Sequence, residues 1–291
     1  MMRNNLSYKF KTADVLVKLI VINAAVFLIV RLGAFFMGMP PGWFSRWFVL
    51  SDDFETILIR PWTLISYGFL HFDFFHILFN MIWLYWFGRI VLNLFTGKRL
   101  LTLYMLGAMS GGLLFALSYS FFPVFQEMRG YLIGASGAVT AIMIFIATYT
   151  PNTEVRIFTF TLKLWHIALF LFLFDLVRIP SSGNAGGLLA HVGGGVFGYS
   201  YALQLMKGND IGKWFENFMD WVANLFKPQA KKPFKKVHRT KRPKSKKTTS
   251  QTSKSDKQKR IDAILDKIGK SGYDSLTKEE KDFLFKAGKE D

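Results

Sequence analysis

Long apolar stretches recur over the first two thirds of the chain and are separated by short polar segments. A bilayer core about 30 Å thick needs roughly 20 apolar residues of helix. Six stretches approach that length: Ala13 to Met37, Phe75 to Phe95, Leu100 to Phe122, Leu132 to Tyr149, Leu162 to Val177 and Ala185 to Met206. The pattern predicts an all-α polytopic membrane protein, with six membrane-spanning helices in a domain over residues 13–206.

Charge is concentrated in one segment, and its placement predicts the topology. Residues 227–260 hold 15 Lys and Arg against one Asp, so they carry +14 of the chain's net +17. Other basic residues precede the first span and flank the turns after spans two and four. Because Lys and Arg accumulate in cytoplasmic loops, we expect residues 1–12 and the tail to be cytoplasmic, which requires an even number of spans.

The region after the last span divides into three parts. Residues 207–227 place Trp214, Phe218 and Trp221 at helical spacing and predict an amphipathic helix at the membrane interface. Residues 228–260, rich in Lys, Ser, Thr and Pro, predict a disordered linker, either drawn to anionic cytoplasmic lipid or simply solvated. Residues 261–291 predict a short cytoplasmic helical module, in which Thr277 and Glu280 have the spacing of a capping box.

Several classes of protein are excluded by composition. The chain has no cysteine, which removes disulfides, zinc–thiolate sites and cysteine nucleophiles. The basic stretch lacks the aromatic residues of a folded RNA-binding module, so no nucleic-acid partner is expected. His71, His76 and His191 do not have the spacing of a metal motif, and neither a metal nor a cofactor is expected.

Polar residues inside the spans are the candidates for chemistry, because such residues are costly in a bilayer. His76 and Asn80 are one helical turn apart in the second span, Ser136 is near the start of the fourth, and His191 is in the sixth. In the predicted topology these spans all enter from the non-cytoplasmic face. At a rise of about 1.5 Å per residue, with Ser136 about four residues inside its span, all four residues lie within roughly 10 Å of that face. We therefore expect them to share one layer.

Small residues predict close packing between the fourth and sixth spans. Ala190, Gly194 and Gly198 form a ridge at intervals of four residues, and the fourth span presents small residues at Gly134, Gly137, Ala138 and Ala141. Such surfaces let membrane helices approach backbone to backbone. The ridge alone indicates packing more often than catalysis.

The combination of a hydroxyl with an imidazole is suited to hydrolysis of a peptide bond. A serine nucleophile needs a neutral imidazole to take its proton and hydrogen-bond donors for the developing oxyanion. Asp175 is the only acid at comparable depth within the spans. Its expected partner is Arg178 in an ion pair near the interface. A two-residue dyad is the economical interpretation, although depth leaves Asp175 open as a third member.

These residues resemble the rhomboid family of intramembrane serine proteases. The resemblance covers Trp62 to about Met206 and consists of PWTLISYGFLH followed by His76 and Asn80, then GASG around Ser136, then AHVGGGVFG around His191. It implies a six-helix rhomboid-like bundle with Ser136 as nucleophile and His191 as base. His76, Asn80 and the Ser136 N–H would form the oxyanion hole. The supporting residues it implies are Gly134, Gly137, Gly194 and His71.

The chain departs from the family pattern at two places. Thr140 stands where the family commonly has an aromatic residue that stacks on the catalytic histidine. Arg60-Pro61-Trp62 stands where the first long loop often has a Trp-Arg pair.

The sequence thus predicts a serine endopeptidase that hydrolyses peptide bonds in or near transmembrane segments, with membrane-protein substrates and a site that opens to the non-cytoplasmic side. The expected location is a bacterial plasma (inner) membrane. A catalytically inactive rhomboid-like adaptor or chaperone is the alternative. A transporter is disfavoured because the spans show neither an internal repeat nor paired broken helices.

Overall fold

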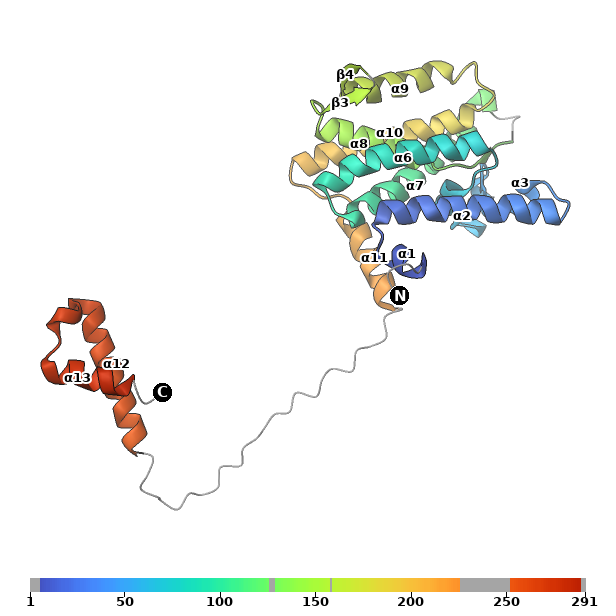
Figure 1. The fold of residues 1–291 in the computed structure, drawn as a ribbon. Coiled ribbons are helices and arrows are strands. Elements are labelled where there is room, and N and C mark those ends of the chain that lie inside the picture. Colours follow the sequence, from blue (N-terminus) through green and yellow to red (C-terminus); the bar gives the residue numbers. More distant parts are fainter. Residues whose placement is uncertain (1–5, 126–128, 158, 226–251, 289–291) are drawn as a thin grey trace. The chain divides into compact units, whose positions relative to one another are not determined.

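A computed structural model describes residues 6–125, 129–157, 159–225 and 252–288 of the chain. The chain divides into two compact units, Met1–Pro228 and Gln229–Asp291. The first unit is mostly helical and contains two short antiparallel strand pairs. Six helices lie side by side in a bundle (Figure 1).

The bundle helices correspond to the six predicted spans. They are α2 (Val15–Phe36), α6 (Phe74–Leu94), α7 (Gly97–Phe121), α8 (Ser136–Tyr149), α9 (Leu164–Arg178) and α10 (Ala185–Met206). Among the described residues, α2, α6 and α7 are long and apolar enough to cross a membrane, and α8 is a shorter apolar helix. All six segments are therefore helical, and three have the length and composition of a span.

Shorter elements connect the bundle helices. They are α1 (Leu6–Thr12), α3 (Pro41–Phe44), β1 (Leu50–Ser51), α4 (Phe54–Ile59), α5 (Thr63–Ser66), η2 (Tyr67–Phe69), η3 (Pro123–Phe125), β2 (Tyr131–Leu132), β3 (Glu154–Ile157), β4 (Phe160–Lys163) and α11 (Lys213–Leu225). Strand β1 pairs with β2, with Leu50 opposite Leu132, and β3 pairs with β4.

Helix α8 begins later than the sequence predicts. The apolar run from Leu132 was expected to be helical, but Tyr131 and Leu132 form strand β2. Gly134 then has a positive φ of 109°, which is not a helical conformation. Ser136 is consequently the first residue of α8 rather than a residue four positions inside it.

Helices α7, α8 and α10 form the centre of the bundle, and α8 and α10 make the closest approach. A methyl group added to Gly194 would overlap the carbonyl oxygen of Gly137, and one added to Gly198 would overlap that of Ala141. The prediction of backbone-to-backbone packing from the small-residue ridge is confirmed. Any larger side chain at these glycines would force the two helices apart.

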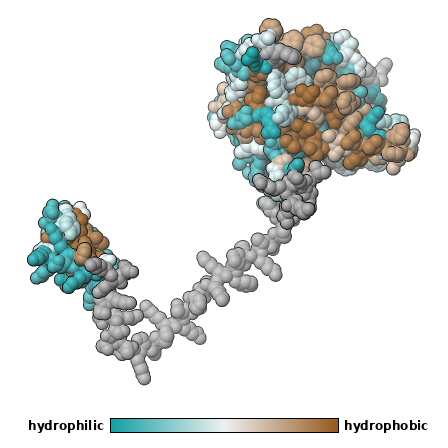
Figure 2. Space-filling view, in the orientation of Figure 1, coloured by the Kyte–Doolittle hydropathy of each residue, from teal (hydrophilic) through white to brown (hydrophobic). Residues whose placement is uncertain are grey.

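Hydrophobic side chains cover much of the face of the bundle seen in Figure 2. Leu28 and Ile29 of α2 are more than half exposed, as are Phe170 and Val177 of α9. Water would penalise such contiguous apolar surface, whereas lipid would not. The surface is that of a membrane-embedded bundle.

A cluster of charged residues joins one end of the bundle to α11. Arg99 of α7 pairs with Asp210 and lies 3.8 Å from Glu216 of α11, measured from Nε to Oε1. The Tyr201 hydroxyl donates to Asp210 at 2.8 Å. Glu216 is only 5% exposed. Lys213 of α11 also pairs with Glu216, at 3.2 Å. Since a buried carboxylate is costly unless it is well paired, and Arg99 is the cation that comes from the bundle, Arg99 helps to hold α11 in place.

Replacing Arg99 by Met should therefore destabilise the membrane domain, by on the order of 3 kcal/mol, because it leaves Asp210 without a cationic partner and Glu216 with Lys213 alone. Lys98→Met is the matched control. Lys98 pairs with Asp220 where both side chains are about half exposed, and such pairs contribute little. Thermal unfolding in micelles measures both variants, and equal midpoints for the two would contradict the role assigned to Arg99.

Helix α11 lies within the predicted segment 207–227. Its Trp214, Phe218 and Trp221 are each at least half exposed, and the rings of Phe218 and Trp221 stack at 6.0 Å. The helix therefore has the exposed aromatic face that the sequence predicts.

The second unit contains α12 (Thr252–Ser271), η4 (Tyr273–Ser275) and α13 (Lys278–Ala287). Helix α12 begins before the predicted boundary at residue 261, so residues 252–260 are helical and not linker. The rest of the predicted linker, residues 228–251, lies outside the described residues. The predicted capping box is confirmed, because Thr277 accepts from the Glu280 N–H and Glu280 accepts from the Thr277 N–H.

Candidate active site

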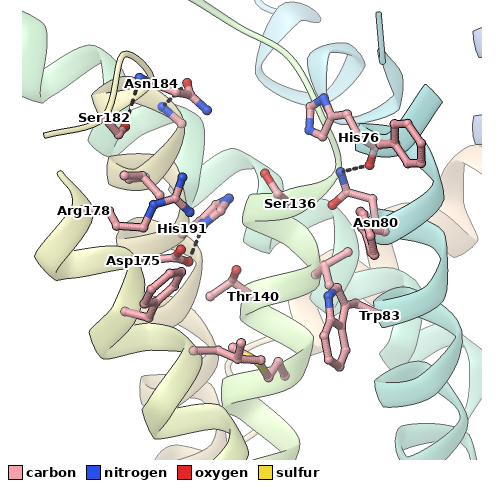
Figure 3. A pocket seen from close by; sticks show the side chains of 18 of the residues that line it. His76, Asn80, Trp83, Ser136, Thr140, Asp175, Arg178, Ser182, Asn184 and His191 are labelled. Carbon is pink, nitrogen blue, oxygen red and sulfur yellow. Dashed lines mark hydrogen bonds and ion pairs between the residues drawn. The ribbon is translucent and has the colours of Figure 1, made fainter. Parts of the chain in front are cut away.

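The four predicted site residues line one cavity of about 470 Å³. His76 and Asn80 come from α6, Ser136 from the start of α8 and His191 from α10. In Figure 3, the Ser136 side chain lies between Asn80 on one side and His191 on the other. The expectation that these residues share one layer is consistent with this common cavity.

Two hydrogen bonds attach the loop before Ser136 to the segment that follows α5. The Gly134 N–H donates to the Tyr67 carbonyl at 3.0 Å, and the Ala135 N–H donates to Nε2 of His71 at 3.3 Å. His71 is fully buried. Burial, with a contribution from nearby His76, lowers the pKa of His71 to about 3, so its ring is neutral and Nε2 can accept. His71 therefore positions the backbone beside Ser136.

The absence of a side chain at Gly134 leaves room for the His76 ring beside this loop. A Cβ at Gly134 would lie 2.7 Å from Cε1 and Nε2 of the His76 ring, and the φ of 109° is unfavourable for residues with a side chain. The His71 and His76 rings pack edge to face with centroids 4.9 Å apart. Gly134 therefore permits the His76 ring to reach the cavity.

Gly134→Ala should accordingly impair the site, because the added methyl group displaces either His76 or the loop before Ser136. If Ser136 is the nucleophile, we expect peptidase activity to fall by about 10²-fold, the cost associated with losing one transition-state donor. Gly38→Ala is the matched control, since Gly38 also has a positive φ, of 63°, but nothing lies within 4 Å of its Cβ position. Comparable activity in the two variants would contradict this role of Gly134.

Asp175 binds His191, which corrects the prediction made for it. Its Oδ2 lies 2.7 Å from Nδ1 of His191, and the expected ion pair with Arg178 is not formed. The Arg178 guanidinium instead lies over the Phe174 ring, 5.2 Å from the centroid. A carboxylate from α9 thus holds the imidazole from α10 (Figure 3), which is the position that the sequence left open for Asp175.

Asn80 is placed to donate into the cavity. It is 6% exposed, and its Nδ2 donates to the backbone carbonyl of His76 at 3.0 Å. An amide nitrogen carries two hydrogens, so one remains for a group bound next to Ser136.

The structure shows no hydrogen bond between Ser136 and His191. Thr140, which replaces the aromatic residue usual in the family, lines the same cavity one turn after Ser136 and is 6% exposed. No aromatic ring from that position is therefore stacked on His191. The imidazole is held through Nδ1 by Asp175 instead.

Of the supporting residues expected, Gly137 and Gly194 act through helix packing, whereas Gly134 and His71 contact the site itself. Among the described residues, no group of three or more His, Asp or Glu side chains has an arrangement that could hold a metal ion.

Comparison with known proteins agrees with the fold. The family model for the Rhomboid domain matches residues 59–208. A second model, "Family of unknown function (DUF6576)", matches residues 250–287. The chain belongs to the rhomboid family.

The chain is similar to three curated relatives over part of its length. RHOMBOID-like protein 12, mitochondrial, of Arabidopsis thaliana is 29% identical over 62% of this chain and 55% of its own length. Rhomboid protein 1, mitochondrial, of Saccharomyces cerevisiae is 25% identical over 72% of this chain and 60% of its own length. Rhomboid-like protein 16, chloroplastic, of Arabidopsis thaliana is 35% identical over 35% of this chain and 30% of its own length. The chain thus spans little more than half the length of the first two relatives.

Proposed function

We propose that the chain is an intramembrane serine endopeptidase that cleaves membrane proteins in or near their transmembrane segments. The observation that carries the proposal is the single cavity in which Ser136, His191, His76 and Asn80 converge, with Asp175 bound to the far nitrogen of His191. Membership of the rhomboid family supports the same reaction.

In the proposed reaction, Ser136 Oγ attacks the peptide carbonyl and Nε2 of His191 takes its proton. Asp175 accepts from the Nδ1–H, which holds the tautomer in which Nε2 is free, and it stabilises the imidazolium that forms. His191 then gives the proton to the leaving amine. Water attacks the acyl group on Ser136 in the second half of the reaction, again with His191 as base.

The oxyanion would be stabilised by Asn80 Nδ2, the His76 ring and the Ser136 backbone N–H. The Ser136 N–H is the first of helix α8, so it has no partner in the preceding turn of helix. Helix N-termini also favour negative charge. The start of α8 at Ser136 thus contributes to the site.

The Ser136–His191 hydrogen bond would form when substrate binds, because catalytic hydrogen bonds are often long in the free enzyme and shorten in the complex. Its absence here also fits the rival function, a catalytically inactive membrane adaptor or chaperone. The two functions differ in whether the purified chain cuts peptide bonds.

Topology completes the proposal. We assign six spans with both termini on the cytoplasmic side, α11 at the interface, and a site that opens to the non-cytoplasmic side of a bacterial plasma membrane. The substrates are membrane proteins, and no cofactor is needed for the reaction described.

Purified chain in detergent should cut a single-span reporter whose transmembrane segment contains helix-destabilising residues, and mass spectrometry of the products should place the cut in or beside that segment. If a panel of such reporters stays intact while the chain binds them, the adaptor function replaces the peptidase.

A further inference from the structure

A second cavity, of about 830 Å³, lies on the other side of the loop that leads to Ser136. Ile133 lines both this cavity and the candidate active site. The remaining wall comes from the α3–α4 region, from Phe72 and from β2. Arg46 and Arg60 both line it, so two cationic side chains border one hollow.

The two arginines are held in place by aromatic rings. The Arg46 guanidinium lies 4.3 Å from the ring centroid of Trp43, and that of Arg60 lies 3.9 Å from the ring centroid of Trp47. Nη1 of Arg60 also donates to the Arg46 carbonyl at 3.4 Å. Trp47 is fixed in turn, because the Trp62 indole N–H donates to its carbonyl at 2.8 Å. Such stacking orients a guanidinium without neutralising it.

The positive charge of this pair is not balanced locally. Within the described residues, neither Arg46 nor Arg60 forms an ion pair. Two nearby carboxylates have other partners, since Asp52 accepts from the Gly130 N–H at 2.8 Å and Asp53 caps α4. Neither acid lines the cavity. The pair is therefore available to an anion from outside the chain.

The surroundings indicate that this anion also has an apolar part. Trp43 and Trp62 are 46% and 47% exposed, and Leu58 and Ile59 are 80% and 72% exposed. Figure 2 shows hydrophobic surface over the end of the bundle formed by α2 and α3. Tryptophans beside cations mark the level of lipid headgroups, and the arginine fork matches phosphate geometry.

We propose that Arg46 and Arg60 bind the phosphate of an anionic phospholipid from the adjacent leaflet. The phosphate lies between the two guanidinium groups, and the acyl chains run along the exposed Trp, Leu and Ile side chains. The site is separate from the basic tail and does not depend on the proposed peptidase activity. Because Ile133 is shared, a bound lipid contacts the segment that leads to Ser136.

The test is native mass spectrometry of the full chain in detergent, titrated with phosphatidylglycerol, phosphatidylcholine or inorganic phosphate. We expect the wild type to prefer phosphatidylglycerol, and the Arg46→Gln/Arg60→Gln variant to bind it about tenfold more weakly. The loss should be smaller for phosphatidylcholine, because its choline cation offsets the charge of the phosphate. Arg31→Gln is the control, since Arg31 lies on α2 outside the cavity. The basic tail is common to all variants, so it adds the same background binding.

The single variant Arg46→Gln controls for misfolding of the double variant. The hydrogen bond from Arg60 goes to the backbone carbonyl of residue 46, so this substitution does not remove it. The single variant should show a smaller loss in the same direction, with an unchanged unfolding midpoint. Equal affinity of wild type and double variant, or an equal loss in Arg31→Gln, would overturn the site. Complete displacement of phosphatidylglycerol by millimolar inorganic phosphate would contradict the assignment of a lipid as the ligand and would indicate a site for free phosphate.

Discussion

Ser136→Ala and His191→Ala are each expected to reduce cleavage of a single-span reporter to the background rate. Removing the hydroxyl removes the group that attacks, and removing the imidazole removes the base that activates it. In soluble serine proteases, members of such a unit act together, so the double variant should be no less active than either single variant. Product formation by purified enzyme in detergent is the measurement.

Ser120→Ala is the matched control for the loss of a hydroxyl. Ser120 is in α7 and donates to the carbonyl of Ala116 at 3.1 Å, so its removal leaves the cavity unchanged. Cleavage by Ser136→Ala at the rate of Ser120→Ala would show that Ser136 is not the nucleophile.

Asp175→Asn is expected to lower kcat by about 10²- to 10³-fold while leaving KM nearly unchanged. The asparagine amide would donate to Nδ1 of His191 and place the ring proton on Nε2, which is then unable to accept from Ser136. A soluble serine protease loses about 10⁴-fold by the same change. We expect less here, because the side chains of His191 and Asp175 are 19% and 20% exposed and water can substitute in part.

Arg178→Gln distinguishes this role from the ion pair suggested by sequence. If Asp175 acts through His191, Arg178→Gln should change kcat by less than about threefold, the level of a weak surface interaction. Equal losses in Asp175→Asn and Arg178→Gln would contradict the assignment of Asp175 to His191. Asp175→Ala should fall between wild type and Asp175→Asn, since it removes the carboxylate without imposing the wrong tautomer.

The helices of the bundle could be predicted from sequence because each is a long apolar run, and apolar length is a local property. Helix α10 has the predicted bounds, and α2 and α6 differ from theirs by one or two residues. The close packing between α8 and α10 could also be predicted from sequence, because Gly194 and Gly198 form a small-residue ridge within one helix. The cavity residues could be chosen because Ser136, His191, His76 and Asn80 are polar residues within apolar runs.

The features that were missed depend on contacts between distant segments. The start of α8 was placed too early because an apolar residue such as Leu132 fits the pattern of a helix and that of a strand equally well. Its pairing with Leu50, which is distant in the sequence, makes it part of a strand. The partner of Asp175 was missed because Arg178 is one turn away on the same helix, whereas His191 comes from α10. An estimate of depth in the membrane places Asp175 and His191 at one level. It does not determine how α9 is rotated about its axis, and therefore which helix Asp175 faces.

The most direct test of the central claim is labelling of the purified chain by a fluorophosphonate probe, with the modified residue located by mass spectrometry. The probe reacts with a serine only where a base and an oxyanion site activate it. We expect one adduct, on Ser136, that is lost in His191→Ala and retained in Ser120→Ala. An unlabelled Ser136 in protein that binds membrane-protein reporters, or labelling that persists in His191→Ala, would contradict it.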